Sequence, residues 1–353
     1  MADLKTKLAR LGALPKGPRQ EAMSSVPPRA PAPVAEPVLP SSLDAGQRAR
    51  LEALRESLIS MRSRQERPRV ALGALPGELM PTEHGPLHLV YEICGAGYHH
   101  GSAAVRDAAR VTARHLCHLA LDDDLDGLEA GRLLFLDTET TGLAGGAGTL
   151  PFLIGLAWFE GEALHVEQLL LRRPGEEAPM LQRLAERLRR ASGIVTFNGK
   201  TFDWPLLRNR FILNRVPCPT GLPHVDLLHC ARRVFGRRPG PMRLTHLERE
   251  VLGFTRVGDI DGAVIPATYF AFLRGADPCT LAPVLTHNRH DVVALAALLG
   301  VLWQRLESPE ACEEAADRLS VAHLTLRAGE EARALAFARA AARGQEPRVL
   351  TEA

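Results

Sequence analysis

The chain has 353 residues, of which 46% are hydrophobic, so it is long enough to bury a substantial core. Its formal net charge of +2 excludes a protein that attracts nucleic acid or membranes through overall charge. The six cysteines are scattered and form no C-x-x-C pair, which indicates neither a zinc knuckle nor a disulfide framework. The sequence has no apolar run of roughly 18 residues and no apolar signal segment, so we expect no membrane association and a cytoplasmic location.

Two segments are predicted before the centre of the chain. Residues 1–45 are rich in Pro and Ala and contain few large apolar groups, which predicts a disordered tail. The second segment, residues 46–130, is expected to hold an N-terminal helix and then a small mixed α/β segment. The helix itself is expected over residues 44–64. In that segment the alternation in HGPLHLVYEIC favours a strand, and SAAVRDAARVTARHLCHLAL has helical spacing.

The centre of the chain, residues 131–306, predicts an α/β domain. Three strands are expected in RLLFLDTE, FLIGLAWF and LHVEQLLL, followed by a helix, the strand GIVTFNG and a second helix. A helical insertion and a long final helix complete the domain. This order is typical of a ribonuclease H-like fold, with a mixed five-stranded sheet whose first three strands are antiparallel and which helices flank.

Residues 309–345 predict a helical pair that is rich in Ala and Leu. It is a candidate for a single repeat of the tetratricopeptide kind, although the full signature is absent and one repeat cannot stack alone. We expect it to pack on the core as a cap, and we keep open a second use, as a surface for a protein partner.

Two carboxylates interrupt the first strand of the predicted domain. Asp137 and Glu139 are separated by one residue, so on a strand both side chains leave the same face. A hydrated strand end would explain them equally well. The apolar run 133–136 before them, however, indicates a buried central strand, and two like charges held together there repel unless a cation lies between them.

Three further candidates follow along the chain. Asp203 lies where a helix is expected to begin, so it is either a helix cap or a site residue. Asp291 and His287 are four residues apart in the final helix and therefore share a face, which is either a polar edge or part of a site. Together the four acids supply hard oxygen ligands that suit two divalent cations, Mg²⁺ or Mn²⁺, and thus hydrolysis of a phosphodiester bond.

The same residues resemble a known family. Asp137, Glu139, Asp203 and Asp291 match the acids of the DEDD superfamily of 3′-5′ exonucleases, and FNGKTFDWPLLRNR looks like the second motif of family B polymerase proofreading domains. The stretches LFLDTETTGLAGGAGTLPFLIGLAWFEGE, VTFNGKTFDWPLLRNRF, HVDLLHCARR and HNRHDVVALA resemble the bacterial YprB-type ribonuclease H-like proteins over about residues 75–303. This resemblance implies that Asp137 bridges two metal ions and that the other three acids complete their ligand sets.

One position departs from the DEDD pattern. Members of that superfamily place Tyr four residues, or His five residues, before the last Asp, where the side chain orients the attacking water. Here Thr286 stands five residues before Asp291 and His287 four residues before it. His287 is therefore a candidate general base, or else it only hydrogen-bonds the fold.

Basic residues near these motifs are candidates for binding nucleic acid. The lone internal lysine, the asparagine before it and several arginines form this set: Asn198, Lys200, Arg208, Arg232, Arg233, Arg237 and Arg238. A solvated charged face would look the same. Phe202 and Trp204 either stack on a base or pack in the core, and Asp226 either supports the site from behind or caps a helix.

The sequence therefore predicts a metal-dependent nuclease, most plainly a 3′-5′ exonuclease that acts on single-stranded DNA or RNA ends. Two alternatives stay open. One is a nucleic-acid-binding or scaffolding protein that keeps the fold without catalysis, and the other is a structure-selective endonuclease. The glycine-rich loop GLAGGAG lacks the G-K-[ST] ending of a phosphate-binding loop, so we expect no nucleotide cofactor.

Overall fold

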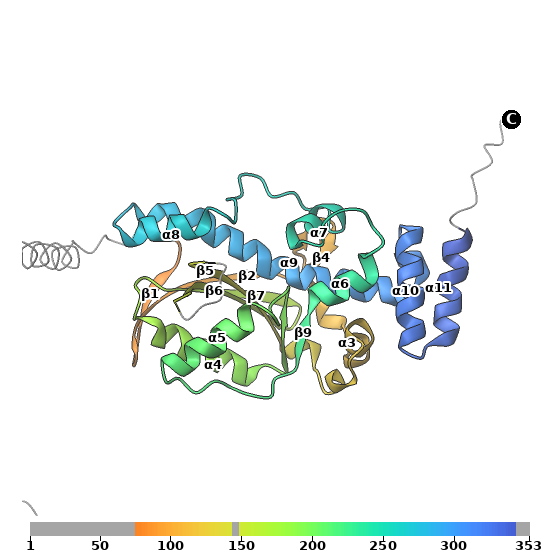
Figure 1. Ribbon diagram of the computed structural model, residues 1–353, viewed down its shortest axis with the longest axis horizontal. Helices are drawn as coiled ribbons and strands as arrows, with labels where there is room; N and C mark the ends of the chain where they lie inside the picture. The colour runs from red at the N-terminus through yellow and green to blue at the C-terminus, as the bar shows by residue number, and fades with distance from the viewer. Residues whose placement is uncertain (1–74, 143–147, 344–353) are drawn as a thin grey trace, which may run out of the picture. The chain divides into compact units, whose positions relative to one another are not determined.

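The structure is a computed structural model that describes residues 75–142 and 148–343, and its centre is a mixed sheet in the order β1-β2-β7-β6-β5-β8-β9 (Figure 1). Its strands are β1 (Glu78–Thr82), β2 (Gly85–Cys94), β5 (Leu133–Thr140), β6 (Pro151–Glu160), β7 (Ala163–Leu170), β8 (Gly193–Thr196) and β9 (His224–Asp226). In the part β1-β2-β7-β6-β5 of this order, each strand pairs antiparallel with its neighbour. β8 is parallel to β5, and β9 is parallel to β8. The predicted α/β class and the antiparallel unit β5-β6-β7 are confirmed.

The expected number of five strands is wrong, because the sheet has seven. The additional strands come from the segment that the sequence analysis placed in a separate mixed unit. β2 pairs with the outer edge of β7 from His88 opposite Leu170 to Cys94 opposite Leu164. An apolar strand edge on β7 would otherwise stay unpaired, so the preceding segment joins the sheet instead of folding beside it. The predicted tail and the predicted helix over 44–64 lie outside the described residues, as does most of the glycine-rich loop.

Helices cover both faces of this sheet (Figure 1). They are α3 (Ala113–Ala120), α4 (Glu177–Arg190), α5 (Asp203–Leu213), α6 (Leu227–Phe235), α7 (Leu244–Glu250), α8 (Ile265–Leu273), α9 (Ala282–Glu307), α10 (Ala315–Arg327) and α11 (Glu331–Arg343). Short 3₁₀ turns connect them: η2 (Val105–Arg110), η3 (Asp123–Leu125), η4 (Ala130–Arg132), η5 (Pro278–Leu281) and η6 (Pro309–Ala311). A two-stranded ribbon, β3 (His99–His100) with β4 (Ala103–Ala104), is separate from the main sheet.

The alternation of side chains along β5 divides the core into two layers. Leu133 and Phe135 belong to a buried cluster that includes α9, whereas Leu134 and Leu136 belong to a second cluster that includes α4 and α5. Because both faces are covered, the first half of β5 is apolar at every position. No described helix combines the length and the apolar composition that crossing a membrane requires.

The C-terminal helical pair packs against the core, as expected. Val321 and Leu324 of α10 and Phe337 of α11 belong to the same buried cluster as α9. A buried ion pair also holds α10, because the Arg238 guanidinium donates to Asp317 with Nε at 2.9 Å from Oδ1, and the Asp317 side chain has no exposed surface. The chain after α6 is thereby tied to α10.

Removal of the Asp317 carboxylate is expected to destabilise the fold. Asp317→Ala leaves the largely buried Arg238 without its partner, and we expect the free energy of unfolding to fall by about 3 kcal/mol. Urea unfolding of the full chain measures the change. Glu313→Ala is the matched control, because Glu313 is 81% exposed and its pair with Arg305 should contribute less than about 1 kcal/mol. Equal losses in the two variants would contradict the prediction.

Candidate active site

The candidate site lies where β5 leaves the core. The first four residues of the strand are buried and the last four are half-buried, so Asp137 and Glu139 stand at the boundary. They share the face of Leu133 and Phe135, which α9 covers. The predicted arrangement of two carboxylates on one face of a strand end is therefore what the structure has.

Asp137 is held by a hydrogen-bonded pair of amide side chains, Gln168 and Asn288, which pack around Gly155. In the sheet register Asp137 lies opposite Gly155 of β6, and Gly155 lies opposite Gln168 of β7. Asn288 of α9 lies over Gly155, so close that a Cβ there would be 2.3 Å from its amide oxygen. Its Oδ1 accepts from Gln168 Nε2 at 2.9 Å and its Nδ2 donates to Asp137 Oδ2 at 2.9 Å. The orientation of the Asn288 amide, and hence the donor that faces Asp137, is fixed by Gln168.

Asp203 reaches the site from the start of α5. The N-cap residue is Phe202, and Asp203 is the first residue of the helix. Asp203 is therefore not the helix cap, which was one of its two expected roles. The Asp203 carboxylate instead accepts a hydrogen bond from the hydroxyl of Thr138, the residue between the two acids of β5. This bond ties the second predicted motif to the first.

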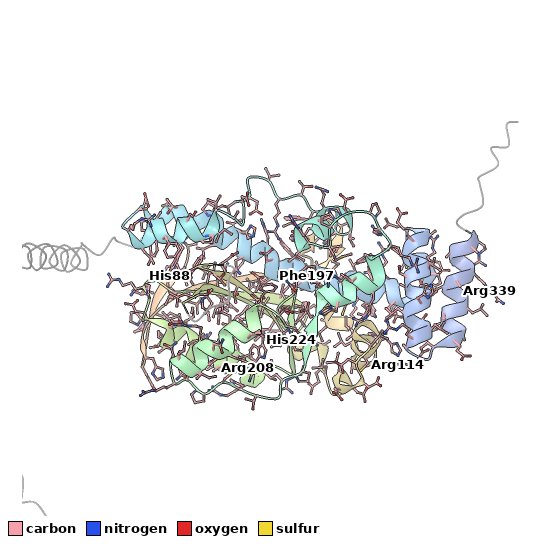
Figure 2. The ribbon with its side chains drawn as sticks, in the orientation of Figure 1. His88, Arg114, Phe197, Arg208, His224 and Arg339 are labelled. Atoms are coloured by element: carbon pink, nitrogen blue, oxygen red, sulfur yellow. The ribbon has the colours of Figure 1, made fainter. Side chains whose placement is uncertain are left out.

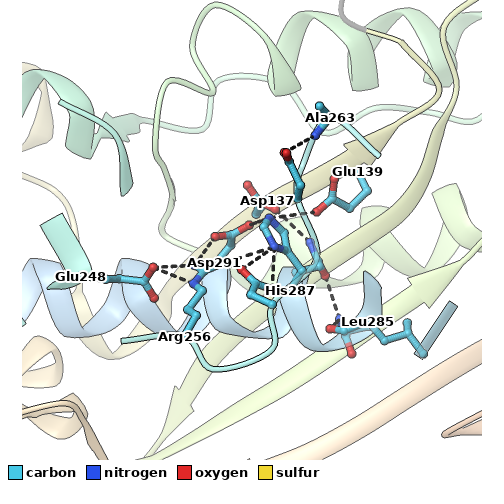
Figure 3. A network of polar contacts seen from close by, with 12 residues as sticks. Asp137, Glu139, Glu248, Arg256, Ala263, Leu285, His287 and Asp291 are labelled. Carbon is cyan, nitrogen blue, oxygen red and sulfur yellow. Dashed lines mark hydrogen bonds and ion pairs between the residues drawn. The ribbon is translucent and has the colours of Figure 1, made fainter. Parts of the chain in front are cut away.

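Asp291 and His287 come from α9 and face the same centre (Figure 3). His287 Nε2 is 3.4 Å from Asp291 Oδ2 and 3.9 Å from Glu139 Oε1. Within the described residues, Glu139, His287 and Asp291 form a group whose ligand atoms all lie within 4.8 Å of one another. The helical spacing of His287 and Asp291 thus places both side chains toward the strand end.

Two further residues of the site come from the chain between α7 and α8, and the sequence analysis did not find them. Arg256 Nη2 donates to Asp291 Oδ1 at 2.6 Å, and its other nitrogens reach Glu248 and Asp259. Asp259 accepts from His287 Nδ1 at 2.9 Å. The sequence treats this region as a helical insertion with no motif, so spacing gave no signal for either residue.

Burial raises the pKa values of the four acids of the site, and repulsion by neighbouring site acids adds to the shift at Asp137 and Glu139. Burial, followed by the charges of Asp291 and Asp203, raises the pKa of Glu139 to about 8. Burial also raises the pKa of Asp203 to about 6, and it raises the pKa values of Asp137 and Asp291. The Arg256 charge opposes the shift at Asp291 but does not cancel it. A centre of this kind is short of positive charge, and hard oxygen donors of this type suit Mg²⁺ or Mn²⁺.

Asp226 caps a helix, as one of its two expected alternatives has it, and it also holds the turn after β8. It caps α6 by accepting from Leu228 N at 3.1 Å. It also accepts from Asn198 N at 2.7 Å and from Lys200 N at 3.1 Å. Asn198 has a φ of 68°, so this turn after β8 needs the external support that Asp226 gives.

The predicted basic residues divide into two groups. Lys200, Arg208, Arg232 and Arg237 are exposed, and Figure 2 labels Arg208, a residue of α5. Arg238 is bound to Asp317, and Arg233 donates to the Leu119 carbonyl at 3.2 Å. The guanidinium groups of Arg233 and Arg238 therefore already serve the fold.

The two aromatic residues beside Asp203 also differ. Trp204 is partly buried against the core cluster that includes α4 and α5, as the packing alternative expects. Phe202 is 55% exposed, and Val257, next to Arg256, is 94% exposed. Apolar side chains open to solvent therefore flank the acids on the α5 side and on the side of the α7–α8 connection.

Comparison with known proteins agrees with this geometry. Residues 134–303, which include the acidic strand end and α9, match the model of the RNase H superfamily. A relative is the uncharacterized protein YprB of Bacillus subtilis (strain 168), which is 40% identical over 174 residues. The match covers 49% of this chain and 42% of that protein. Over this central part the chain is therefore similar to ribonuclease H-like proteins and to YprB.

A side chain at Gly155 is expected to disturb the support of Asp137. In Gly155→Ala the new methyl group would be 2.3 Å from Asn288 Oδ1, so the amide must move or the sheet must shift. We expect a loss of about 1–3 kcal/mol in the free energy of unfolding, measured with urea. Gly127→Ala is the control, since a Cβ at Gly127 meets nothing within 4 Å. A loss no larger than that of the control would contradict the close fit.

The raised pKa values predict how the stability of metal-free protein depends on pH. The pKa of Glu139 is raised from 4.5 to about 8 and that of Asp203 from 3.8 to about 6. The folded state therefore binds more protons than the unfolded state between about pH 4 and pH 8, so the free energy of unfolding falls as pH rises through that window.

This dependence can be measured by urea unfolding in the presence of a chelator from about pH 5 to about pH 8. Asp137→Asn removes one of the interacting carboxylates, and we expect a shallower fall with pH in that variant. Saturating Mn²⁺ should reduce the fall in the wild type, because cations bind the ionised carboxylates. A stability that rises across this window in the chelated wild type would refute the prediction.

Proposed function

We propose that this protein is a metal-dependent nuclease that hydrolyses phosphodiester bonds at the centre formed by Asp137, Glu139, Asp203 and Asp291. The observation that carries the proposal is the convergence of acids from β5, α5 and α9 on one strand end, with pKa values raised by burial and mutual repulsion. Such a cluster is unfavourable by itself, and cations would remove the repulsion. The superfamily match supports a nuclease-type function.

The four acids are the proposed ligands of two divalent cations, Mg²⁺ or Mn²⁺. When bound, two such ions activate a water molecule and neutralise charge on the phosphate during an in-line displacement. Asp137 would be a cation ligand, and Asn288 Nδ2 donates to its Oδ2 at 2.9 Å. Thr138 fixes Asp203, and the half-buried end of β5 leaves the centre accessible from one side.

His287 is the proposed general base. Its Nε2 faces Glu139 and Asp291, in position to accept a proton from an attacking water molecule. Lys200 and Arg208 are the proposed phosphate contacts that lie closest in sequence to Asp203. Arg232 and Arg237 are proposed contacts farther along the chain. The exposed Phe202 next to Asp203 offers a stacking surface for a base, which favours single-stranded ends of DNA or RNA as the substrate.

The cleavage pattern is proposed to be that of a 3′-5′ exonuclease. A structure-selective endonuclease is distinguished by whether circular single-stranded DNA is cut, since an exonuclease needs an end. A protein that binds nucleic acid without catalysis would bind the same oligonucleotides tightly in chelator and leave them intact. The C-terminal pair, with Leu326 and Leu335 exposed, remains a proposed surface for a protein partner.

The proposal predicts that Asp137→Asn abolishes cleavage without unfolding the chain. Purified protein with Mn²⁺ or Mg²⁺ should shorten end-labelled single-stranded DNA or RNA, and the variant should be slower by at least about 100-fold, because a proposed direct ligand is lost. Calorimetric titration should show two Mn²⁺ sites in the wild type and a loss of binding in the variant.

Asp124→Asn, at an exposed carboxylate of η3, controls for the substitution itself. Intact oligonucleotides with wild-type protein and both metals, together with identical behaviour of Asp137→Asn, would reject the nuclease. Tight metal-free binding in that case would favour the nucleic-acid-binding alternative.

A further inference from the structure

The connection between α7 and α8 contributes a carboxylate that the resemblance and the proposed ligand set leave unused. Asp259 is 2.9 Å from His287 Nδ1 through either of its oxygens, and its side chain is largely buried. His287 turns its other nitrogen, Nε2, toward Glu139 and Asp291. The ring therefore lies between Asp259, which contacts Nδ1, and the acids Glu139 and Asp291, which Nε2 faces.

We infer that Asp259 is a positioning residue that holds His287 in the orientation and tautomer that catalysis requires. This inference rests on the proposed nuclease function. A carboxylate only accepts hydrogen bonds, so the 2.9 Å contact with Asp259 assigns the proton of a neutral ring to Nδ1 and leaves the lone pair on Nε2. Arg256 Nη1 is 3.4 Å from the same Nδ1, and in this tautomer it donates to Asp259 and not to the ring. The lone pair points to the place where the proposed reaction needs a proton acceptor.

Arg256 fixes Asp259 from behind. Its Nη1 is 3.3 Å from Asp259 Oδ2, while Nη2 contacts Asp291 at 2.6 Å. The Arg256 guanidinium thus contacts both Asp259, which orients His287, and Asp291, which lies beside His287 at the centre. Two donors, Arg256 Nη1 and His287 Nδ1–H, converge on Asp259, which leaves that carboxylate little freedom to rotate away.

A buried anchor holds Arg256. Glu248 of α7 accepts from Arg256 Nε at 2.8 Å and from His100 Nε2 at 2.8 Å, and both Glu248 and His100 are fully buried. Phe254 stacks on the His100 ring with 3.8 Å between the ring centroids. The chain that carries Arg256 and Asp259 is therefore fastened at one end to the β3–β4 ribbon, which explains how a stretch without regular structure can position a catalytic group.

The proposed step conserves atoms and charge. The water oxygen forms the new bond to phosphorus as the P–O ester bond breaks, and one proton of that water moves to His287 Nε2. The leaving ester oxygen keeps the electron pair of the broken bond and takes a proton from solvent. The ring is then positively charged, and Asp259 stabilises that charge through Nδ1–H. Without Asp259 the ring would lose both its fixed tautomer and this stabilisation.

The test compares Asp259→Asn with Asp261→Asn in the full chain. Asp261 lies in the same connection and has an exposed side chain that accepts only from the backbone of Ala263, so it is a matched control. We expect Asp259→Asn to lower kcat by about 10–100-fold with KM for the oligonucleotide unchanged, and Asp261→Asn to behave as wild type. Calorimetry should give wild-type Mn²⁺ affinity for both variants.

Two readouts separate positioning from a loss of structure. Nitrogen-15 NMR of the His287 ring, assigned with His287→Gln, should show the Nδ1–H tautomer in the wild type and its loss in Asp259→Asn, without any need for substrate. In the His287→Gln background, Asp259→Asn should have no further effect on kcat, because both residues act through one group.

The inference fails if the Nδ1–H tautomer persists in Asp259→Asn while kcat equals that of Asp261→Asn. It also fails if the two substitutions are additive, or if the loss of kcat follows a loss of Mn²⁺ affinity, which would make His287 a metal ligand. A wild type without nuclease activity would reject the proposed function, whereas the tautomer measurement would still decide whether Asp259 orients the ring.

Discussion

The repulsion among carboxylates at the end of β5 is the constraint on which the rest of the site depends. Asp137 and Glu139 share one face because of the strand period, and α5 and α9 bring two more acids to the same place. Burial raises the pKa values of all four. Such a cluster is tolerated only where surrounding groups hold each acid and where protons or cations reduce the charge.

Side chains from β5, β7 and α9 hold the acids in place. Gly155 makes room for Asn288, Gln168 orients the amide of Asn288, and that amide holds Asp137. The hydroxyl of Thr138 holds Asp203. Each contact joins residues far apart in the sequence, so the acids are positioned by the sheet register and by the packing of α9.

Positive charge near the centre has two distinct uses. Arg256 is buried and bound to Asp291, so it belongs to the permanent structure of the site. Lys200 and Arg208 are exposed, and they are the proposed contacts to phosphates. The arginine-rich stretch after α6 contains both kinds, since Arg238 stabilises the contact with α10 while Arg237 is exposed. Charge density in the sequence therefore overstated the surface that is open to nucleic acid.

The sequence by itself determined the α/β class, the antiparallel start of the sheet and two local pairs, Asp137 with Glu139 and His287 with Asp291, because strand and helix periods fix which side chains share a face. It could not determine that β1 and β2 extend the sheet, since pairing with β7 depends on an edge that exists only after folding. Nor could it find Arg256, Asp259 or the fit of Asn288 over Gly155. These contacts lie in an irregular connection or between distant segments, where no local period records them, so only the tertiary structure decided them.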